Sequence, residues 1–284
     1  MQAGRAASRI PAPLYALGAI ASVQIGATVA RRLFDSIGPT GTVFLRVAFG
    51  ALLLIALARP RTRLAPSQWQ SIALFGLVVA AMNFCFYQAI ARIPLGIAVT
   101  IEFVGPLGLA IAGSRKPLDF TWALMAAIGV ALLSLTGGTV SLSGLLFAAG
   151  AAVGWAAYIV LSQRVGRVVP GPDGLAVALL IGGVALAPFG IASAGGNLLN
   201  LNALSLGLVV AVLSTAIPFS LEFAALRRLP SRVFGILMSL EPAVGAAAGF
   251  VLLGQLLSLR DLLAMALVIA ASAGATATAV DLRG

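Results

Sequence analysis

The feature that most constrains this chain is a succession of apolar runs, each about 20 residues long and separated by short loops. A helix needs about 20 apolar residues to cross the hydrocarbon core of a bilayer. Charged residues make up only 9% of the 284 residues, whereas a soluble domain carries about 25%. The sequence therefore predicts an all-α membrane protein, and the loops leave no room for a water-soluble domain.

Ten such runs can be placed along the chain. They are expected at about 11–30, 41–58, 71–91, 95–113, 120–136, 145–161, 175–194, 206–226, 233–253 and 259–279. A basic segment before an apolar run can also be a secretory signal, but the first run is long for a signal and nine more follow it. We therefore predict ten transmembrane helices.

Positive charge is distributed unevenly over the loops. If the N-terminus is cytoplasmic, the cytoplasmic ends hold Arg5, Arg9, Arg59, Arg61, Arg63, Arg115, Lys116, Arg164, Arg167, Arg227, Arg228, Arg232 and Arg283. The opposite ends hold Arg31, Arg32, Arg92 and Arg260, and Arg46 lies inside a run. Because loops rich in lysine and arginine remain in the cytoplasm, both termini are expected there.

The composition also excludes several classes of function. The chain has no histidine and one cysteine, Cys85, which rules out a His/Cys metal site and a Ser/His/Asp catalytic set. The only lysine, Lys116, follows no glycine-rich loop, so there is no P-loop for ATP. The net charge of +10 lies in the inter-span loops and does not indicate nucleic-acid binding. We expect no cofactor, no metal and no enzymatic activity, and we disfavour a passive channel.

One stretch of the chain occurs twice. Arg92-Ile-Pro94 recurs as Arg228-Leu-Pro230, and Gly105-Pro106 recurs as Glu241-Pro242, with both pairs of prolines 136 residues apart. Five spans separate the copies, and an odd number reverses their direction across the membrane. Inverted repeats with interrupted helices near the midplane are typical of secondary transporters. We predict a 5+5 inverted repeat with halves 11–136 and 141–280.

Two carboxylates lie inside apolar runs beside these prolines. Glu102 and Glu241 enter the bilayer from opposite faces and are expected within about two turns of its midplane. A carboxylate at that depth must face a cavity or a partner. Our hypothesis is that one of them receives the ammonium group of a substrate or the coupling proton. The alternative is a structural carboxylate tied to a neighbouring helix.

Other side chains are candidates for the wall of a substrate cavity. They are Gln24, Asn83, Tyr87, Trp155 and Tyr158. Pro106 and Pro242 are either gating kinks or tolerated helix breaks, and Gly105 would let a substrate or a helix approach closely. Arg46 is expected to snorkel or to pair helices rather than clamp a substrate carboxylate. Glu222 is expected to form a salt bridge near the cytoplasmic mouth.

Five segments carry a family likeness. They are Val47-Ala48-Phe49-Gly50 after Arg46, Pro94 to Pro106, Gly154 to Tyr158, Leu213 to Glu222, and Arg228 to Pro242. With these segments the chain resembles the drug/metabolite transporter superfamily of the type with two EamA domains, and it is most similar to the threonine/homoserine exporter branch. The resemblance implies ten helices in a 5+5 inverted repeat, a central cavity, cytoplasmic termini, a bacterial inner membrane, and export rather than uptake.

Two functions remain open at this point. The first is a secondary exporter of small amino acids, threonine-like, homoserine-like or aromatic, working by alternating access and driven by protons. The second is a broad drug or metabolite exporter of the same fold. The expected partners are a small amino acid and the lipid bilayer. Small residues of the last run, Ala270, Ala271, Ser272 and Gly274, suit packing within the chain or between two copies in a homodimer.

Overall fold

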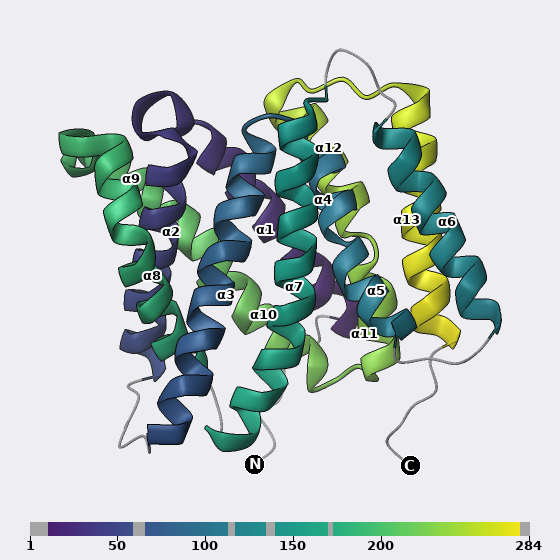
Figure 1. Cartoon of the computed structure of the whole chain (residues 1–284), viewed down its shortest axis with the longest axis horizontal. Coiled ribbons are helices and arrows are strands. Elements are labelled where there is room, and N and C mark those ends of the chain that lie inside the picture. The colour runs from purple at the N-terminus through teal and green to yellow at the C-terminus, as the bar shows by residue number, and fades with distance from the viewer. Residues whose placement is uncertain (1–10, 59–65, 113–116, 135–139, 170–172, 279–284) are drawn as a thin grey trace, which may run out of the picture.

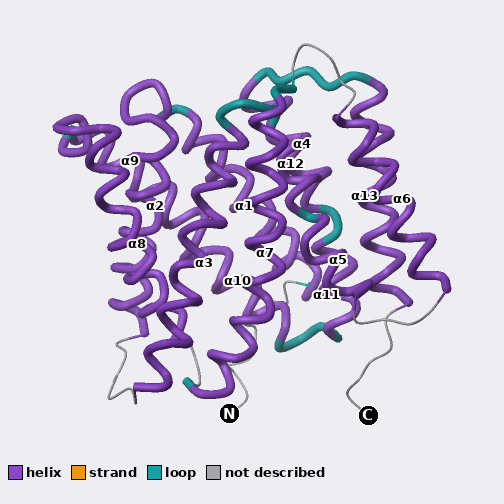
Figure 2. The backbone as a smooth tube through the Cα atoms, viewed as in Figure 1, coloured by secondary structure: helices purple, strands orange, loops and turns teal. Residues whose placement is uncertain are grey.

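The computed structural model describes residues 11–58, 66–112, 117–134, 140–169 and 173–278, and these residues are almost entirely helical, with no strand among them (Figure 1). The all-α prediction is confirmed. The loop cations Arg5, Arg9, Arg59, Arg61, Arg63, Arg115, Lys116 and Arg283 lie outside the described residues. Figure 2 shows most loops at the two ends of the molecule, with a further break inside the helical layer.

The first part of the chain forms α1 (Ala12–Arg31), α2 (Phe34–Ala58), α3 (Pro66–Ile90), α4 (Leu95–Glu102), α5 (Val104–Ala112) and α6 (Pro117–Ser134). The second part forms α7 (Leu142–Val168), α8 (Asp173–Ala194), the 3₁₀-helix η1 (Gly195–Leu199), α9 (Leu201–Ala211), the π-helix η2 (Val212–Ala216), α10 (Ile217–Leu226), α11 (Ser231–Met238), α12 (Glu241–Leu253) and α13 (Leu259–Thr278). Each expected apolar run corresponds to one helix or to consecutive shorter helices.

Eight of these helical segments are long and apolar enough to cross a membrane. They are α1, α2, α3, α7, α8 and α13, together with the segments Leu201–Leu226 and Val233–Leu253. Two further apolar helices, Leu95–Leu109 and Leu118–Leu133, are shorter. The described part of the chain therefore contains a multi-pass set of helices.

The repeated prolines begin new helices instead of bending existing ones. Pro106 is the third residue of α5, and Pro242 is the second residue of α12. The first turn of a helix has no intrahelical partner for its N–H groups, so a proline there costs no hydrogen bond. The α4 helix has already ended at Glu102, and the structure therefore favours helix breaks over kinks at both sites.

The two copies of the repeated stretch have the same local structure. Adding 136 to the bounds of α4 gives the bounds of α11, and each helix has eight residues. Pro94 caps α4 with φ −56° and ψ 142°, and Pro230 caps α11 with φ −56° and ψ 140°. The same offset pairs Glu102 with Met238 and Glu241 with Gly105. The acids of the two copies are therefore at different positions of the same local fold.

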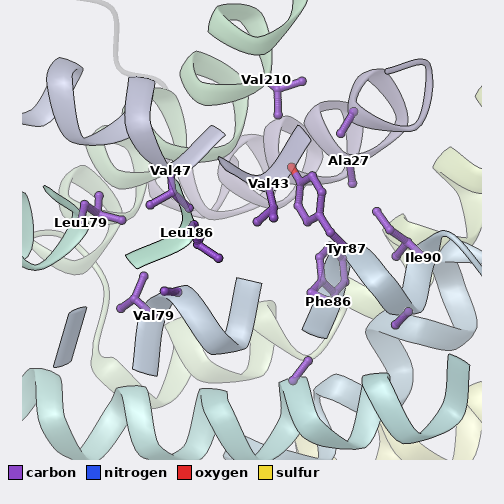
Figure 3. Packing of buried hydrophobic residues seen from close by; sticks show 14 of the residues in the cluster. Ala27, Val43, Val47, Val79, Phe86, Tyr87, Ile90, Leu179, Leu186 and Val210 are labelled. Atoms are coloured by element: carbon purple, nitrogen blue, oxygen red, sulfur yellow. The ribbon is translucent and has the colours of Figure 1, made fainter. Parts of the chain in front are cut away.

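Helices distant in sequence pack closely in the interior. The α2 helix packs on α8, α3 packs on α7 and α8, and α6 packs on α13. Figure 3 shows the core that joins the first three helices with α8 and α9, in which Tyr87 and Phe86 lie among Val43, Ala27 and Val210. Close packing needs small residues, and a Cβ atom at Gly76 would overlap the backbone carbonyl of Ala178 in α8.

The small residues of α13 pack within the chain. A Cβ atom on Gly274 would lie 2.7 Å from the Trp122 ring of α6, and Ala271 is fully buried. The Trp122 indole N–H also donates a hydrogen bond to the Thr278 hydroxyl at 3.2 Å. Much of the small-residue face expected from the sequence is therefore used by α6.

Candidate functional site

A cavity of about 480 Å³ lies at the centre of the helical assembly. Its wall includes one arginine and three glutamates, namely Arg46 from α2, Glu102 from the end of α4, Glu222 from α10 and Glu241 from the start of α12. Aromatic residues also line it, and the Trp155 ring packs edge-on against the Phe103 ring at 5.3 Å. The wall therefore combines charged groups with apolar and aromatic surface.

Most of the residues expected at a cavity from the sequence line this one. They are Gln24, Asn83, Glu102, Pro106, Trp155, Tyr158 and Glu241. Asn83 donates a hydrogen bond from Nδ2 to the Val79 carbonyl at 2.8 Å. Gln24 is 2% exposed, and its Oε1 atom has no hydrogen-bond partner among the described residues.

Tyr87 was expected at the cavity wall and does not line it, and neither do Gly105 and Pro242, which were expected at a gating kink or a helix break. Tyr87 is 1% exposed and packs in the core, with its ring 6.1 Å from the rings of Phe34 and Phe86. It lies one turn beyond Asn83 on α3, where the helix is enclosed by its neighbours. Gly105 serves helix packing instead, because a Cβ atom there would overlap the backbone carbonyl of Ala152 in α7. Pro242 is buried in the first turn of α12.

The three cavity carboxylates share one electrostatic environment. Glu102, Glu222 and Glu241 line the same cavity as Arg46. Within the described part of the chain, none of these four side chains forms an ion pair. No group of three or more His, Cys, Asp or Glu residues among the described residues is arranged to hold a metal ion. A bound organic cation or a proton would be the natural counter-charge for the acids.

Glu222 differs from its sequence expectation. It lines the cavity and has no salt bridge within the described chain. The arginines that follow it contact aromatic rings, because the helix end places them on the exposed surface. The Arg227 guanidinium carbon lies 5.9 Å from the Phe223 ring centroid, and that of Arg228 lies 5.1 Å from the Tyr15 ring centroid.

Arg46 also lies at the cavity rather than snorkelling to a membrane surface. Its Nη2 atom donates to the Ser214 carbonyl at 3.3 Å, and its guanidinium carbon lies 5.5 Å from the Tyr87 ring centroid. Its Nε atom is buried without a hydrogen-bond partner among the described residues. The expected helix-pairing contact is present, but it holds a cation at the cavity wall.

The π-helix η2 is a part of the site that sequence reasoning missed. Pro218 lacks the N–H that would bond the Ser214 carbonyl four residues back, so this carbonyl is free for another donor. Arg46 donates a hydrogen bond to the Ser214 carbonyl, and the Ser22 hydroxyl of α1 donates to the neighbouring Leu213 carbonyl at 2.7 Å. A proline inside an apolar run was the available signal, because it predicts one unpaired carbonyl.

The cavity reaches one end of the molecule. Its wall includes Leu175 near the start of α8, Glu222 near the end of α10, Phe234 in the first turn of α11 and Thr276 in the last turn of α13. These helix ends lie at the lower end in Figure 1, where α1 begins and α13 ends. The cavity therefore extends towards the end of the molecule at which α1 begins and α13 ends.

Polar contacts join the helices at the opposite end. Gln88 donates from Nε2 to the Thr40 hydroxyl at 3.0 Å, and Arg92 donates from Nη1 to Gln88 Oε1 at 2.6 Å. The Arg92 guanidinium carbon lies 4.9 Å from the Phe147 ring centroid. The backbone N–H of Leu95 donates to Gln255 Oε1 at 3.0 Å, which ties α4 to the segment after α12.

Ionisable side chains around a cavity between membrane-spanning helices mark a pathway or a binding site for a substrate or an ion. The family model described as the EamA-like transporter family matches residues 10–137 and 142–277. This chain belongs to the EamA-like transporter family. Its members are transporters and not enzymes, in agreement with the expectation from composition.

Known relatives cover nearly the whole chain. The chain is 45% identical over 269 residues to the threonine/homoserine exporter RhtA of Salmonella typhimurium strain LT2, covering 93% of this chain and 91% of the relative. It is 45% identical over 266 residues to RhtA of Escherichia coli strain K12, covering 92% and 90%. The similarity to the threonine/homoserine exporter branch is confirmed, and it supports a multi-pass protein of a bacterial inner membrane.

A solved structure shares the fold. A crystal structure of a protein superposes with a TM-score of 0.65 at 23% sequence identity, covering 96% of this chain and 99% of that chain. At this level of identity the likeness concerns the fold alone.

Proposed function

We propose that this protein is a secondary exporter of threonine, homoserine and similar small amino acids. The observation that carries the proposal is the 45% identity to threonine/homoserine exporters over 93% of the chain. The cavity of about 480 Å³ suits a small ligand, since ligand sites commonly enclose about 300–1,000 Å³. Its acids would receive the ammonium group of the amino acid.

The helix packing supports a 5+5 inverted repeat with halves 11–136 and 141–280. Spans at equivalent places in the two halves meet one another, as α2 meets α8 and α6 meets α13. The span of α4 and α5 likewise meets the span of α11 and α12, through the contact of α4 with α12. The contact of α3 with α7 has a counterpart in the contact of α1 with α9 and α10. A two-fold axis in the membrane plane generates this pattern of pairs.

Alternating access follows from such a repeat. The cavity continues to the end where α1 begins and α13 ends, and polar contacts join the helices at the other end. The loop charges favour a cytoplasmic location for the end that the cavity reaches. This state would therefore load substrate from the cytoplasm. Separation of the polar contacts at the opposite end would then release the substrate outside.

Proton coupling fits the three cavity acids. Glu102, Glu222 and Glu241 lie at the wall without an ion pair in the described chain, so each can accept a proton or face an ammonium group. No nucleotide-binding loop is present in the sequence to supply energy. A proton gradient is the energy source that these side chains serve best.

Transport by purified protein in proteoliposomes tests the proposal. The panel would be radiolabelled threonine, homoserine, methionine, phenylalanine and a lipophilic cation, with and without a proton gradient. We expect gradient-stimulated flux of threonine and homoserine. The alternative, a drug or metabolite exporter, is favoured by the aromatic wall with three acids and predicts flux of the lipophilic cation alone. That result would overturn the proposed substrate class.

A further inference from the structure

Arg46 is a lone cation in an acidic wall. Among the described residues that line the cavity, it is the only positive side chain, and three carboxylates accompany it. Within the described part of the chain, no ion pair joins Arg46 to any of these carboxylates. An unpaired guanidinium is costly to keep away from bulk water. The site can therefore bind an anionic group at Arg46 and a cationic group at its carboxylates.

The Arg46 guanidinium is held at the cavity wall by a hydrogen bond to a backbone carbonyl that lacks its usual partner within the helix. The Ser214 carbonyl is available because Pro218 has no N–H to offer it, and Arg46 Nη2 contacts it at 3.3 Å. This distance is long for an N–H···O bond, whose usual length is about 2.9–3.0 Å. Nε has no partner among the described residues. The Arg46 guanidinium is thus held in position, while part of its hydrogen-bonding capacity is unsatisfied among the described residues.

We propose that Arg46 is the residue that binds the α-carboxylate of the transported amino acid, with the Ser214 carbonyl holding its guanidinium ready until the carboxylate arrives. The inference deepens the proposed function and rests on it. Guanidinium groups bind carboxylates through two parallel hydrogen bonds, which gives the pair a defined orientation. The ammonium group of the same zwitterion then faces the Glu102 side of the cavity.

The same geometry explains why a lipophilic cation would be a poor ligand. Such a cation could neutralise a carboxylate, but it would meet the charge of Arg46 without offering a counter-ion. A zwitterion offers a carboxylate to Arg46 and an ammonium group to a cavity acid within one small molecule. Arg46 therefore contributes to the choice between the two substrate classes.

Substrate binding would also change the contacts of the π-helix η2. η2 is tied to its neighbours by two described hydrogen bonds to its carbonyls, one from Ser22 to Leu213 and one from Arg46 to Ser214. A carboxylate that draws the guanidinium into the cavity weakens the second bond and leaves the first. Binding in the cavity then loosens the attachment of η2, which connects α9 to α10.

Ligand binding to the purified full-length protein tests this role without requiring transport. In a Trp69→Phe/Trp122→Phe background, Trp155 at the cavity wall is the remaining tryptophan and its fluorescence reports binding. The ligands are threonine and threoninol, which has the same ammonium and hydroxyl groups but a hydroxymethyl group in place of the carboxylate. We expect threonine to bind at least about tenfold more tightly, which corresponds to about 1.4 kcal/mol, because only threonine can form charge-assisted hydrogen bonds with the guanidinium.

The variants separate Arg46 from the general fold. Arg46→Gln should weaken threonine binding to the level of threoninol while leaving threoninol unchanged, and Arg46→Lys should restore part of the preference. Arg228→Gln, an exposed arginine outside the cavity wall, is the matched control and should keep the full preference. Equal affinities of the unaltered protein for the two ligands would overturn the proposal with no substitution involved.

The outcomes also distinguish this proposal from the proposed function. Retained preference for threonine in Arg46→Gln would overturn the role of Arg46 and leave threonine as a substrate. Absence of threonine binding to the unaltered protein, together with absence of threonine flux, would overturn the proposed substrate and the role of Arg46 with it.

Discussion

Gly96 of α4 lies directly against Ala246 of α12, so close that a Cβ atom on Gly96 would be 2.7 Å from the Ala246 Cα atom. This contact joins the two parts of the chain at the start of a broken helix. Because the obstructing atom belongs to the backbone, the helices must separate to accept any side chain at residue 96.

We expect Gly96→Ala to destabilise the protein by about 1–3 kcal/mol, the usual effect of overpacking. The thermal unfolding midpoint of the purified protein measures it. Gly108→Ala is the matched control, because nothing lies within 4 Å of a Cβ atom at that position. An equal loss of stability in both variants would contradict the packing explanation.

Removing a cavity acid should uncouple transport from protons. Glu102→Gln and Glu241→Gln each keep the size of the side chain but remove the charge, and we expect gradient-driven threonine efflux to fall at least about tenfold, which corresponds to about 1.4 kcal/mol. Flux measurements in proteoliposomes check this. Asp119→Asn, a buried acid of α6 that does not line the cavity, should leave coupling intact. Normal gradient-driven flux in both glutamate variants would rule out the role of these acids.

Loss of the Arg92 side chain, which joins the end of α3 to α7 through the Phe147 ring, should open the far end of the cavity more often. Arg92 donates to Gln88 Oε1 at 2.6 Å and its guanidinium lies over the Phe147 ring. The contact with the Phe147 ring joins the end of α3 to α7, and a cation–π contact contributes about 0.5–2 kcal/mol, so Arg92→Ala should raise opening several-fold. The measurement is labelling of Phe86→Cys by a membrane-impermeant maleimide in a Cys85→Ser background. Arg92→Lys should show a smaller increase, and unchanged labelling in Arg92→Ala would argue against a closing role.

The inverted repeat predicts opposite sides for two equivalent turns. Arg92 and Arg228 are both exposed and precede Pro94 and Pro230 by two residues. In a Cys85→Ser background, Arg92→Cys should react with an impermeant maleimide on intact cells, whereas Arg228→Cys should react only after permeabilisation. Reaction of both cysteines from the same side would exclude inverted halves.

Much of the fold was predictable because lipid imposes a simple rule. Each apolar run had to satisfy its own backbone hydrogen bonds, and each became helical. The breaks were harder to place. The break after Met238 precedes Pro242 by several residues, and a proline marks a discontinuity without fixing the residue at which the earlier helix ends.

The site was predictable at residues whose burial in lipid would be costly. Glu102 and Glu241 line the cavity for that reason. Tyr87 was a weaker inference, because a tyrosine can pack in a core as readily as face a cavity, and only the neighbouring helices decide between these positions. The helix-pairing role of Arg46 was predictable but its partner was not, because the Ser214 carbonyl lies 168 residues away in sequence and on another helix.

The mismatch between the two copies has a consequence for the resting protein. If the two halves had identical sequences, the inward-open and outward-open forms would be related by a two-fold rotation and would have equal free energy. Glu102 corresponds to Met238 and Glu241 corresponds to Gly105, which removes this degeneracy. We therefore expect the empty carrier to prefer one orientation, and its ligand to have a different apparent affinity on each side of the membrane.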